Sequence, residues 1–412
     1  MATLYPFRAL RPCPSDAARI AAVPYDVVTT EEARVLADGN PLSFLRVSRA
    51  EIELPESTDP HSDAVYDRAR RNFSTLKDAS LVVEDAPSVY VYRLRMGQHE
   101  QTGLAGCFSL DEYDHGVIKK HERTRRDKED DRTRHIIALG AQTGPVFLVY
   151  RASAEVNQVA ARTSSTGAGP LIDFTAPDGV QHTLWTASRA DRDALVSAFA
   201  RIPALYIADG HHRAASAARA RDDFRRRGAA GTCLGDGAGC DTVLAVAFPH
   251  DQVQILPYNR SVQDLGGLSV ERFLQAVAER FTVEPGPATP AARGAIAMYV
   301  GGRWQTIRPR VKPAASDAIS SLDVSVLQEG LLGPVLNVAD IRTDTRIDFV
   351  GGARGTAALE QAVDRGAAAV GFSLFPVSVA DLMTVSDAGA IMPPKSTWFE
   401  PKLRDGLLIH VI

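Results

Sequence analysis

The stretch Leu205-Tyr-Ile-Ala-Asp-Gly-His-His-Arg213 carries the strongest structural signal in the chain. Its first four residues are apolar or aromatic and predict a buried strand, and the Ala-rich sequence from Ala214 to about Arg227 predicts a helix directly behind it. The Asp-Gly-His-His-Arg segment therefore lies in a strand-to-helix turn. At such a turn the first N–H groups of the helix have no partner within the helix, and they attract anions.

The side chains of this turn suit a phosphate group. Gly210 lets the backbone approach a phosphate closely, while His211, His212 and Arg213 add donors, the last of them able to bind two phosphate oxygens at once. Asp209 is a second anion at the same place, and it could coordinate Mg²⁺ or take a proton from an attacking hydroxyl group. The simpler alternative is that Asp209 caps the helix and the histidines are ordinary surface groups.

A second segment, from His121 to Arg132, is dense in charges of both signs. One interpretation is a solvated charged face, which is the usual role of such runs. The functional interpretation is a mobile loop that closes over phosphates, with Glu122 as base or metal ligand. The phosphate-binding side chains expected from this region are His121, Arg123, Thr124, Lys128 and Arg132, with Lys119 and Lys120 beside them.

Two proline-bounded stretches are candidates for a substrate pocket. Pro393-Pro-Lys-Ser-Thr397 places a lysine and two hydroxyl groups next to rigid prolines, and Pro24-Tyr-Asp26 has a similar character near the start of the chain. The alternative is a pair of loops that proline merely holds in shape. The pocket residues predicted from these stretches are Tyr25, Asp26, Lys395, Ser396 and Thr397.

Length and composition exclude several classes of protein. The chain has 412 residues with 46 Lys and Arg against 50 Asp and Glu, so it lacks the basic surplus of a general nucleic-acid binder. No apolar run reaches the roughly 18 residues that a membrane-spanning helix needs, and no secretory signal is recognisable. Four scattered cysteines predict free thiols rather than a disulfide framework. We therefore expect a cytoplasmic protein that binds neither membrane nor nucleic acid.

The remaining pattern predicts a mixed α/β or α+β fold. Strands and helices alternate, but too irregularly to require a doubly wound sheet. Composition shifts suggest an N-terminal α/β region (1–95), a core (96–264) and a C-terminal α/β region (265–412). The main expected strands are 88–94, 104–110, 146–150, 205–208, 243–248, 297–300, 347–350, 367–372 and 407–412, and the main expected helices are 63–76, 190–200, 214–227, 270–278 and 356–366. Thr29 or Thr30 is expected to cap a further helix, with Glu31 and Glu32 in its first turn.

Several familiar catalytic motifs are absent from the sequence. It contains no Gly-x-x-x-x-Gly-Lys-Ser/Thr loop, no His-Glu-x-x-His and no Gly-x-Ser-x-Gly. The Gly-rich turn at 351–355 follows an expected strand and precedes an expected helix, but it lacks the dinucleotide-binding spacing. If the chain binds a nucleotide, it does so with another motif.

Taken together, seven segments resemble the bacterial and archaeal family called domain of unknown function 1015. In chain order they are Pro6-Phe-Arg-Ala9, Val23-Pro-Tyr-Asp-Val27, Asn40-Pro-x-Ser-Phe44, His121-Glu-x-Thr124, Ala208-Asp-Gly-His-His-Arg213, Leu256-Pro-Tyr-Asn-Arg260 and Pro393-Pro-Lys-Ser-Thr-x-Phe-x-Pro-Lys402. The resemblance covers nearly the whole chain. Asn259 stands where the family often has His, so no chemistry is expected at that position.

The Asp-Gly-His-His-Arg core is in turn similar to the ParB/sulfiredoxin-like superfamily, which includes free-serine kinases. This resemblance implies a ParB-like nucleotide-binding core with N- and C-terminal α/β extensions, ATP or ADP as co-substrate and Mg²⁺ as cofactor. It also implies catalytic roles for Asp209, which matches the motif Asp, and for Glu122, which matches an upstream Glu. The family's Lys-x-Asp-Arg pattern has an extra acidic residue here, so either Asp130 or Asp131 holds the family position.

Two functional hypotheses follow from the resemblance. The first is a nucleotide-dependent kinase that phosphorylates the hydroxyl group of a small molecule, most simply free L-serine, with Glu122 or Asp209 orienting and deprotonating it and Asp209 binding Mg²⁺. The alternative is a ParB-like protein that binds and hydrolyses nucleotides for regulation, without kinase activity. The expected partners are the nucleotide and a hydroxylated small molecule, and a homodimer is among the oligomeric states left open.

Overall fold

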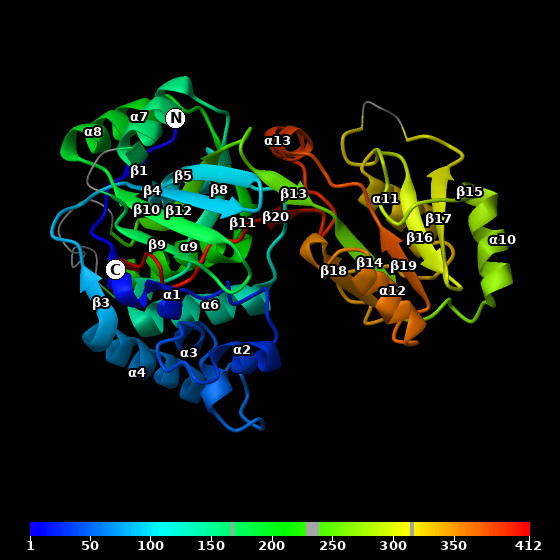
Figure 1. Cartoon of the computed structure of the whole chain (residues 1–412), viewed down its shortest axis with the longest axis horizontal. Helices are drawn as coiled ribbons and strands as arrows, with labels where there is room; N and C mark the ends of the chain where they lie inside the picture. Colours follow the sequence, from blue (N-terminus) through cyan, green and yellow to red (C-terminus); the bar gives the residue numbers. More distant parts are fainter. Residues whose placement is uncertain (166–168, 228–238, 314–316) are drawn as a thin grey trace. The chain divides into compact units, whose positions relative to one another are not determined.

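The computed structural model describes residues 1–165, 169–227, 239–313 and 317–412 and divides into two compact units (Figure 1). Unit 1 contains Met1–Lys120, Thr124–Val253 and Pro401–Ile412, whereas unit 2 contains His121–Arg123 and Gln254–Glu400. The chain therefore leaves unit 1 after Val253 and returns to it for the last twelve residues. Each unit is described by itself below.

Unit 1 is built on a mixed sheet, which confirms the mixed α/β class. Among the described residues, nine strands form this sheet in the order β6-β11-β8-β12-β5-β4-β10-β9, with β1 beside β5. β8 runs parallel to β12 and antiparallel to β11. The strands are β1 (Leu4–Tyr5), β4 (Tyr90–Met96), β5 (His99–Ser109), β6 (Ile118–Lys119), β8 (Val146–Tyr150), β9 (Ile172–Thr175), β10 (Gln181–Thr186), β11 (Leu205–Asp209) and β12 (Thr242–Pro249). The strands predicted at 88–94, 104–110, 146–150, 205–208 and 243–248 are among them.

Helices and two small sheets complete unit 1. The small sheets pair β2 (Leu10–Pro12) with β3 (Leu81–Val83) and β7 (Ala141–Gln142) with β21 (His410–Val411). The helices are α1 (Ala17–Ile20), α2 (Thr30–Ala37), α3 (Leu45–Ser48), α4 (Asp63–Ser80), α5 (Leu110–Asp114), α6 (Arg126–Leu139), α7 (Ala154–Ser165), α8 (Arg189–Phe199) and α9 (His211–Arg226). Figure 1 shows α2, α3 and α4 gathered on the side of α6 that faces away from the sheet.

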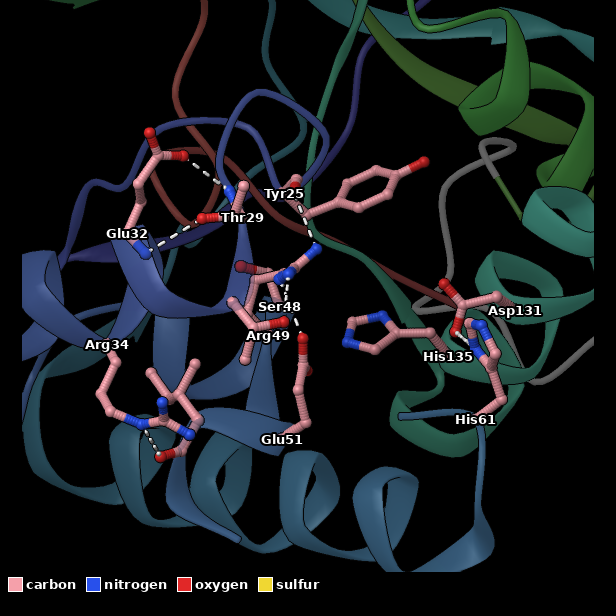
Figure 2. A network of polar contacts seen from close by, with 12 residues as sticks. Tyr25, Thr29, Glu32, Arg34, Ser48, Arg49, Glu51, His61, Asp131 and His135 are labelled. Carbon is pink, nitrogen blue, oxygen red and sulfur yellow. Dashed lines mark hydrogen bonds and ion pairs between the residues drawn. The ribbon is translucent and has the colours of Figure 1, made fainter. Parts of the chain in front are cut away.

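The predicted cap of the first long helix is confirmed. Thr29 is the N-cap of α2, where its side chain accepts a hydrogen bond from the Glu32 backbone while the Glu32 side chain accepts one from the Thr29 backbone (Figure 2). This reciprocal pair satisfies two of the N–H groups that a helix start leaves open. The cap fixes where the loop carrying Tyr25 and Asp26 ends.

The interpretation of the charged segment as a mobile loop is wrong for residues 126–134, which form the first part of α6. Two acidic residues of this segment have partners on α9: Arg219 forms ion pairs with Glu129 and Asp130, and the Ser216 hydroxyl donates to the Glu129 carbonyl at 3.2 Å. Opposite charges on two packed helices stabilise the helical conformation, so the density of charge did not indicate a loop here.

Unit 2 has its own six-stranded sheet in the order β15-β17-β16-β19-β14-β18, with β13 and β20 paired separately. The strands are β13 (Gln254–Leu256), β14 (Tyr258–Val262), β15 (Phe281–Pro285), β16 (Ile296–Val300), β17 (Arg303–Pro309), β18 (Ile347–Gly351), β19 (Val370–Ser373) and β20 (Trp398–Glu400). The helices are α10 (Val270–Arg280), α11 (Asp323–Leu327), α12 (Ala357–Asp364) and α13 (Val379–Asp387). The predicted helices 270–278 and 356–366 correspond to α10 and α12.

Three other expectations meet the structure only in part. The three-region division remains a prediction, and the β4–β5 hairpin crosses its boundary at residue 95. Among the described residues, Cys13, Cys107 and Cys240 form no disulfide, while Cys233 and the Gly-rich loop around it, up to residue 238, lie outside them. The strand expected at 407–412 is shorter, since the structure has a strand only at His410–Val411, beside an isolated bridge between Ile409 and Leu10. A search of the described helices finds none that combines the length and the apolar character needed to cross a membrane.

Candidate phosphate-binding turn

The Asp-Gly-His-His-Arg segment forms the predicted strand-to-helix turn. β11 ends at Asp209, α9 begins at His211, and between them Gly210 is the N-cap with a φ of 93°, in the left-handed region that favours glycine. The register of β11 against β8 shifts between Ile207 and Asp209, an irregularity of the kind that re-aims a side chain at the end of a strand. Gly210 has no side chain with which to cap α9, so no N-cap side chain occupies the start of this helix, a place that favours anions.

Asp209 is held as a carboxylate by two cations. Its Oδ1 accepts a hydrogen bond from the Gly210 N–H at 2.9 Å, and its Oδ2 accepts one from Lys402 Nζ at 3.1 Å. Burial by itself would raise the pKa of Asp209, but Lys402 and Arg213 outweigh that effect and hold the pKa well below its ordinary value. Asp209 is therefore ionised at neutral pH.

Arg213 is turned inward from the start of α9 and already has protein partners. Its Nη1 donates to the Pro145 carbonyl at 2.8 Å and its Nη2 donates to Asp26 at 3.1 Å. Burial would lower the pKa of Arg213, but the carboxylates of Asp26, Asp209 and Asp405 raise it instead. A phosphate gripped by both terminal nitrogens, as expected from the sequence, would have to replace these two partners.

The two histidines of the turn differ in their surroundings. His211 is buried at the first position of α9, whereas His212 is half-exposed. The Arg125 N–H lies 3.0 Å from His212 Nε2 and donates to it. This bond ties the turn to the residue that precedes α6, so His212 has a structural role whatever it binds.

Residues of α6 and of the loop before α2 complete the surroundings of Arg213. The Arg132 guanidinium lies 4.2 Å from the centroid of the Tyr25 ring and pairs with Asp131 at 2.8 Å. Arg213 also faces this ring, at 5.9 Å. Burial raises the pKa of Tyr25, with Asp26 adding to the effect, so its phenol group stays neutral. The structure thus brings Tyr25, Asp26 and Arg132 together with Arg213.

Other candidates from the charged segment have local partners. The Thr124 hydroxyl donates to Glu129, and Lys128 lies half-buried in the first turn of α6. Asp131 pairs with Arg132, whereas Asp130 pairs with Arg219 on α9. Asp131 is therefore the acidic residue that lies beside Tyr25 and Arg132.

The remaining predicted site residues belong to unit 2. His121, Glu122 and Arg123 group with this unit, where the Met392 N–H donates to the His121 carbonyl at 2.8 Å. Lys395 has a φ of 58° and its Nζ lies 5.6 Å from the centroid of the Tyr258 ring, while the buried Ser396 donates to the Pro393 carbonyl at 2.6 Å. Thr397 follows it, half-buried. That these residues join Asp209 in one site stays a prediction.

Sequence reasoning missed two charged residues of the last segment, Lys402 and Asp405. Lys402 closes the Pro-rich motif that ends at that residue, so the motif itself could have indicated it, but no local pattern marks Asp405. Burial raises the pKa of Asp405 to about 7; Arg213 and Arg132 oppose this effect and Asp26 adds to it. Asp405 therefore exchanges its proton near neutral pH.

The turn can bind an anion and a hard cation side by side. The start of α9 and the Lys402 ammonium group favour negative charge. The Asp209 carboxylate offers an oxygen ligand, and Mg²⁺ in phosphate sites is commonly held by one or two carboxylates together with the phosphates themselves. An ionised, half-buried Asp209 thus fits the Mg²⁺ that the sequence implies.

Comparisons with known proteins place these features in a family. A sequence profile described as "Protein of unknown function (DUF1015)" matches residues 4–325. An uncharacterized protein, y4kA of Sinorhizobium fredii, is 34% identical over 143 residues, which make up 31% of this chain and 42% of that protein. The chain thus matches less than half the length of this relative.

The comparison with solved structures finds distant matches, with low sequence identity and TM-scores below 0.5. A mutant of a free serine kinase in complex with AMP has a TM-score of 0.36 and 13% identity, over 73% of this chain and 92% of the kinase. SbnI from Staphylococcus aureus has a TM-score of 0.38 and 15% identity, over 74% of this chain and 86% of that one. A conserved hypothetical protein from Pyrococcus furiosus has a TM-score of 0.35 and 13% identity, over 73% and 93%.

Proposed function

The chain belongs to the DUF1015 family, and on this premise we propose that it is a nucleotide-dependent kinase that phosphorylates the hydroxyl group of a small molecule, most simply free L-serine. The co-substrate is ATP or ADP, and Mg²⁺ is the cofactor. Phosphoryl transfer requires positioning of the reactants and neutralisation of charge more than covalent chemistry by the protein. A few charged groups fixed at one turn can therefore provide a large part of the catalysis of phosphoryl transfer.

One observation carries the proposal: Asp209 lies between the end of a strand and the uncapped start of a helix, ionised and paired with Lys402. Lys402 already accompanies the Asp209 carboxylate, so a second anion bound beside it would call for a further cation. A nucleotide phosphate bound with Mg²⁺ supplies both charges. The phosphate would lie on the N–H groups of α9 and near the Lys402 ammonium group, and Asp209 would hold the metal ion.

The residues divide into two roles. Bound Mg²⁺ would supply charge neutralisation at the transferred phosphate. Asp209 is a weak base because Lys402 and Arg213 hold its pKa below the ordinary range, so it suits metal binding better than proton abstraction. We therefore assign to Glu122 the proton of the acceptor hydroxyl group. Gly210 allows the close approach of the phosphate, and His212 keeps the turn attached to the start of α6.

The test is an assay of the purified full chain with ATP or ADP, Mg²⁺ and L-serine, in which phosphoserine is measured by mass spectrometry. Asp209→Asn should lower turnover by roughly 100-fold or more, because it removes the carboxylate that would hold Mg²⁺ beside the transferred phosphate. Asp222→Asn is the matched control: Asp222 lies on the same helix, is exposed and pairs with Arg221, so turnover should stay at the wild-type level.

Two results would overturn the proposal. The first is turnover of Asp209→Asn equal to that of the wild type. The second is nucleotide hydrolysis that proceeds without any transfer to L-serine or to other small hydroxylated molecules, which would favour the regulatory nucleotide hydrolase instead. Glu122→Gln tests the assigned base separately, and it should lower turnover while leaving nucleotide binding unchanged.

A further inference from the structure

A pocket adjoins the phosphate-binding turn in unit 1 and shares Arg213 with it. Its empty space is about 450 Å³, with open solvent included. The polar side chains that line it and matter here belong to Tyr25, Ser48, Arg132, Arg213 and Asp405. Figure 2 shows Tyr25, Ser48 and a further lining residue, His135, approaching from three separate elements.

Three of these lining residues have a buried polar atom without a partner. Within the described part of the chain, no hydrogen bond reaches Ser48 Oγ, Arg213 Nε or Asp405 Oδ1. Buried polar atoms nearly always have a partner, because an unpaired one costs about 1–3 kcal/mol. A molecule with polar atoms in this pocket would supply partners to these three atoms.

The charges around the pocket do not balance. Arg132 pairs with Asp131, and Arg213 pairs with Asp26. Asp405 faces both arginines, Asp26 and the backbone of Tyr25, but among the described residues no cation forms an ion pair with its carboxyl group. With Asp405 ionised, three carboxylates oppose two guanidinium groups, so the cluster has one negative charge in excess. A ligand with a cationic group would correct this.

Gly144 makes room for the Asp405 carboxyl group. A Cβ atom at this position would overlap with Asp405 Oδ1. The backbone on both sides of Asp405 is also held in place: its N–H and C=O exchange hydrogen bonds with Ala22, and the Gly406 N–H donates to the Thr143 carbonyl at 2.9 Å. The backbone hydrogen bonds thus fix the position of Asp405, and Gly144 leaves the space that its carboxyl group occupies.

We infer that this pocket binds the acceptor of the proposed kinase, that the acceptor is a small amino acid, and that Asp405 is the counter-ion of its ammonium group. The Nε–H of Arg213 would then donate to the carboxylate of the same molecule. That the bound amino acid is the acceptor rests on the proposed kinase function, but binding of the amino acid in this pocket does not require catalysis. Asp405 acts as a specificity-determining residue, and Arg213 joins the acceptor pocket to the phosphate-binding turn.

The inference is tested by calorimetric titration of the full chain without nucleotide or Mg²⁺. The probes are L-serine, which has both charged groups, ethanolamine, which lacks the carboxylate, and D-glycerate, which lacks the ammonium group. We expect L-serine to bind most tightly and D-glycerate to bind least. Asp405→Asn should weaken L-serine binding by roughly tenfold or more, as is usual when one partner of a buried charge pair is removed.

Two further variants distinguish recognition from a general loss of structure. Gly144→Ala keeps the carboxyl group but displaces it, so it should weaken L-serine binding while leaving the binding of a fluorescent ADP analogue unchanged. Asp222→Asn should bind L-serine as the wild type does. Asp405→Asn should itself fold, because an amide replaces a carboxyl group that burial already favours in its neutral form.

The outcomes separate this inference from the proposed function. Equal binding of L-serine by the wild type and Asp405→Asn, equal binding of D-glycerate and L-serine, or no binding of any probe by the wild type would each overturn it. If L-serine binds through Asp405 but no phosphoserine forms with ATP or ADP, the kinase proposal fails while the amino-acid pocket stands.

Discussion

The pKa values of two carboxyl groups near Arg213, those of Asp209 and Asp405, are shifted in opposite directions by their surroundings. Lys402 and Arg213 hold the pKa of Asp209 low against the effect of burial, whereas burial prevails at Asp405 and raises its pKa to about 7. Pairs of titratable groups with separated pKa values are typical of sites where one group must stay charged and the other must exchange a proton. The difference arises because Lys402 contacts Asp209 directly, whereas no ammonium group of the described residues forms an ion pair with Asp405.

The raised pKa of Asp405 predicts a dependence of stability on pH. In the folded protein Asp405 keeps its proton up to about pH 7, but in the unfolded chain it loses it near pH 4, so the folded state binds more protons between these values. Its contribution to the free energy of unfolding must therefore fall as the pH rises from about 4 to about 7. The total change is on the order of 4 kcal/mol, since one pKa unit corresponds to about 1.4 kcal/mol.

The measurement compares urea denaturation of the wild type and Asp405→Asn at several pH values. The wild type should lose stability relative to the variant as the pH rises through this range, and the difference should be constant above about pH 8. His135 is present in both proteins, and burial lowers its pKa to about 4, so its opposite contribution cancels. A pH-independent difference between the two proteins would contradict the assignment.

At the scale of elements, α9 is placed by the small residues on its buried face. Ala214, Ala217 and Ala220 pack into the main core of unit 1, and α6 lies against the same helix through Ser216 and Arg219. Small side chains let a helix approach its neighbours closely, so the start of α9, and with it the phosphate-binding turn, is fixed by a tightly packed surface.

This packing predicts the cost of a larger side chain. Ala220→Leu adds three carbon atoms at a position with no exposed surface and should lower the free energy of unfolding by about 1–3 kcal/mol. Ala190→Leu is the matched control, because Ala190 is exposed on α8 and the change should cost less than about 0.5 kcal/mol. Urea denaturation of both variants measures the difference, and equal effects would show that α9 is not tightly packed at Ala220.

On the scale of the whole molecule, the last segment of the chain returns to unit 1 and contributes to both its core and its site. Leu403, Leu407, Leu408 and Ile409 are almost completely buried, and β21 pairs with β7. The same segment supplies Lys402 to Asp209 and Asp405 to the pocket. Stability and the candidate chemistry of unit 1 therefore both depend on the final twelve residues.

Truncation after Glu400 should destabilise unit 1 strongly. Each of the four buried aliphatic side chains contributes about 1.5–3 kcal/mol, and the sum is comparable with the whole stability of a typical domain, about 5–15 kcal/mol. Chemical denaturation of the truncated chain should show an unfolded or barely stable unit 1. The full-length Asp222→Asn variant keeps the apolar segment and changes only an exposed side chain, so it should unfold close to the wild-type denaturant concentration. A truncated chain as stable as the wild type would refute the prediction.

The sequence by itself determined the local structure at the turn. Apolar residues, then Asp-Gly, then an Ala-rich run predict strand, turn and helix through interactions between near neighbours, and β11, Gly210 and α9 follow this order. The Thr29 cap was predictable for the same reason. The mixed α/β class also followed from such local patterns, as did the motifs that identify the family.

Only the tertiary structure decided what surrounds the turn. Lys402 is 193 positions from Asp209 and Asp26 is 187 positions from Arg213, and no local pattern encodes either contact. The same holds for Asp405, whose raised pKa depends on burial by segments far apart in the chain. Propensity and periodicity act between neighbours, whereas burial and charge pairing act through space. The turn could therefore be found in the sequence, but its counter-ions and the adjoining pocket could not.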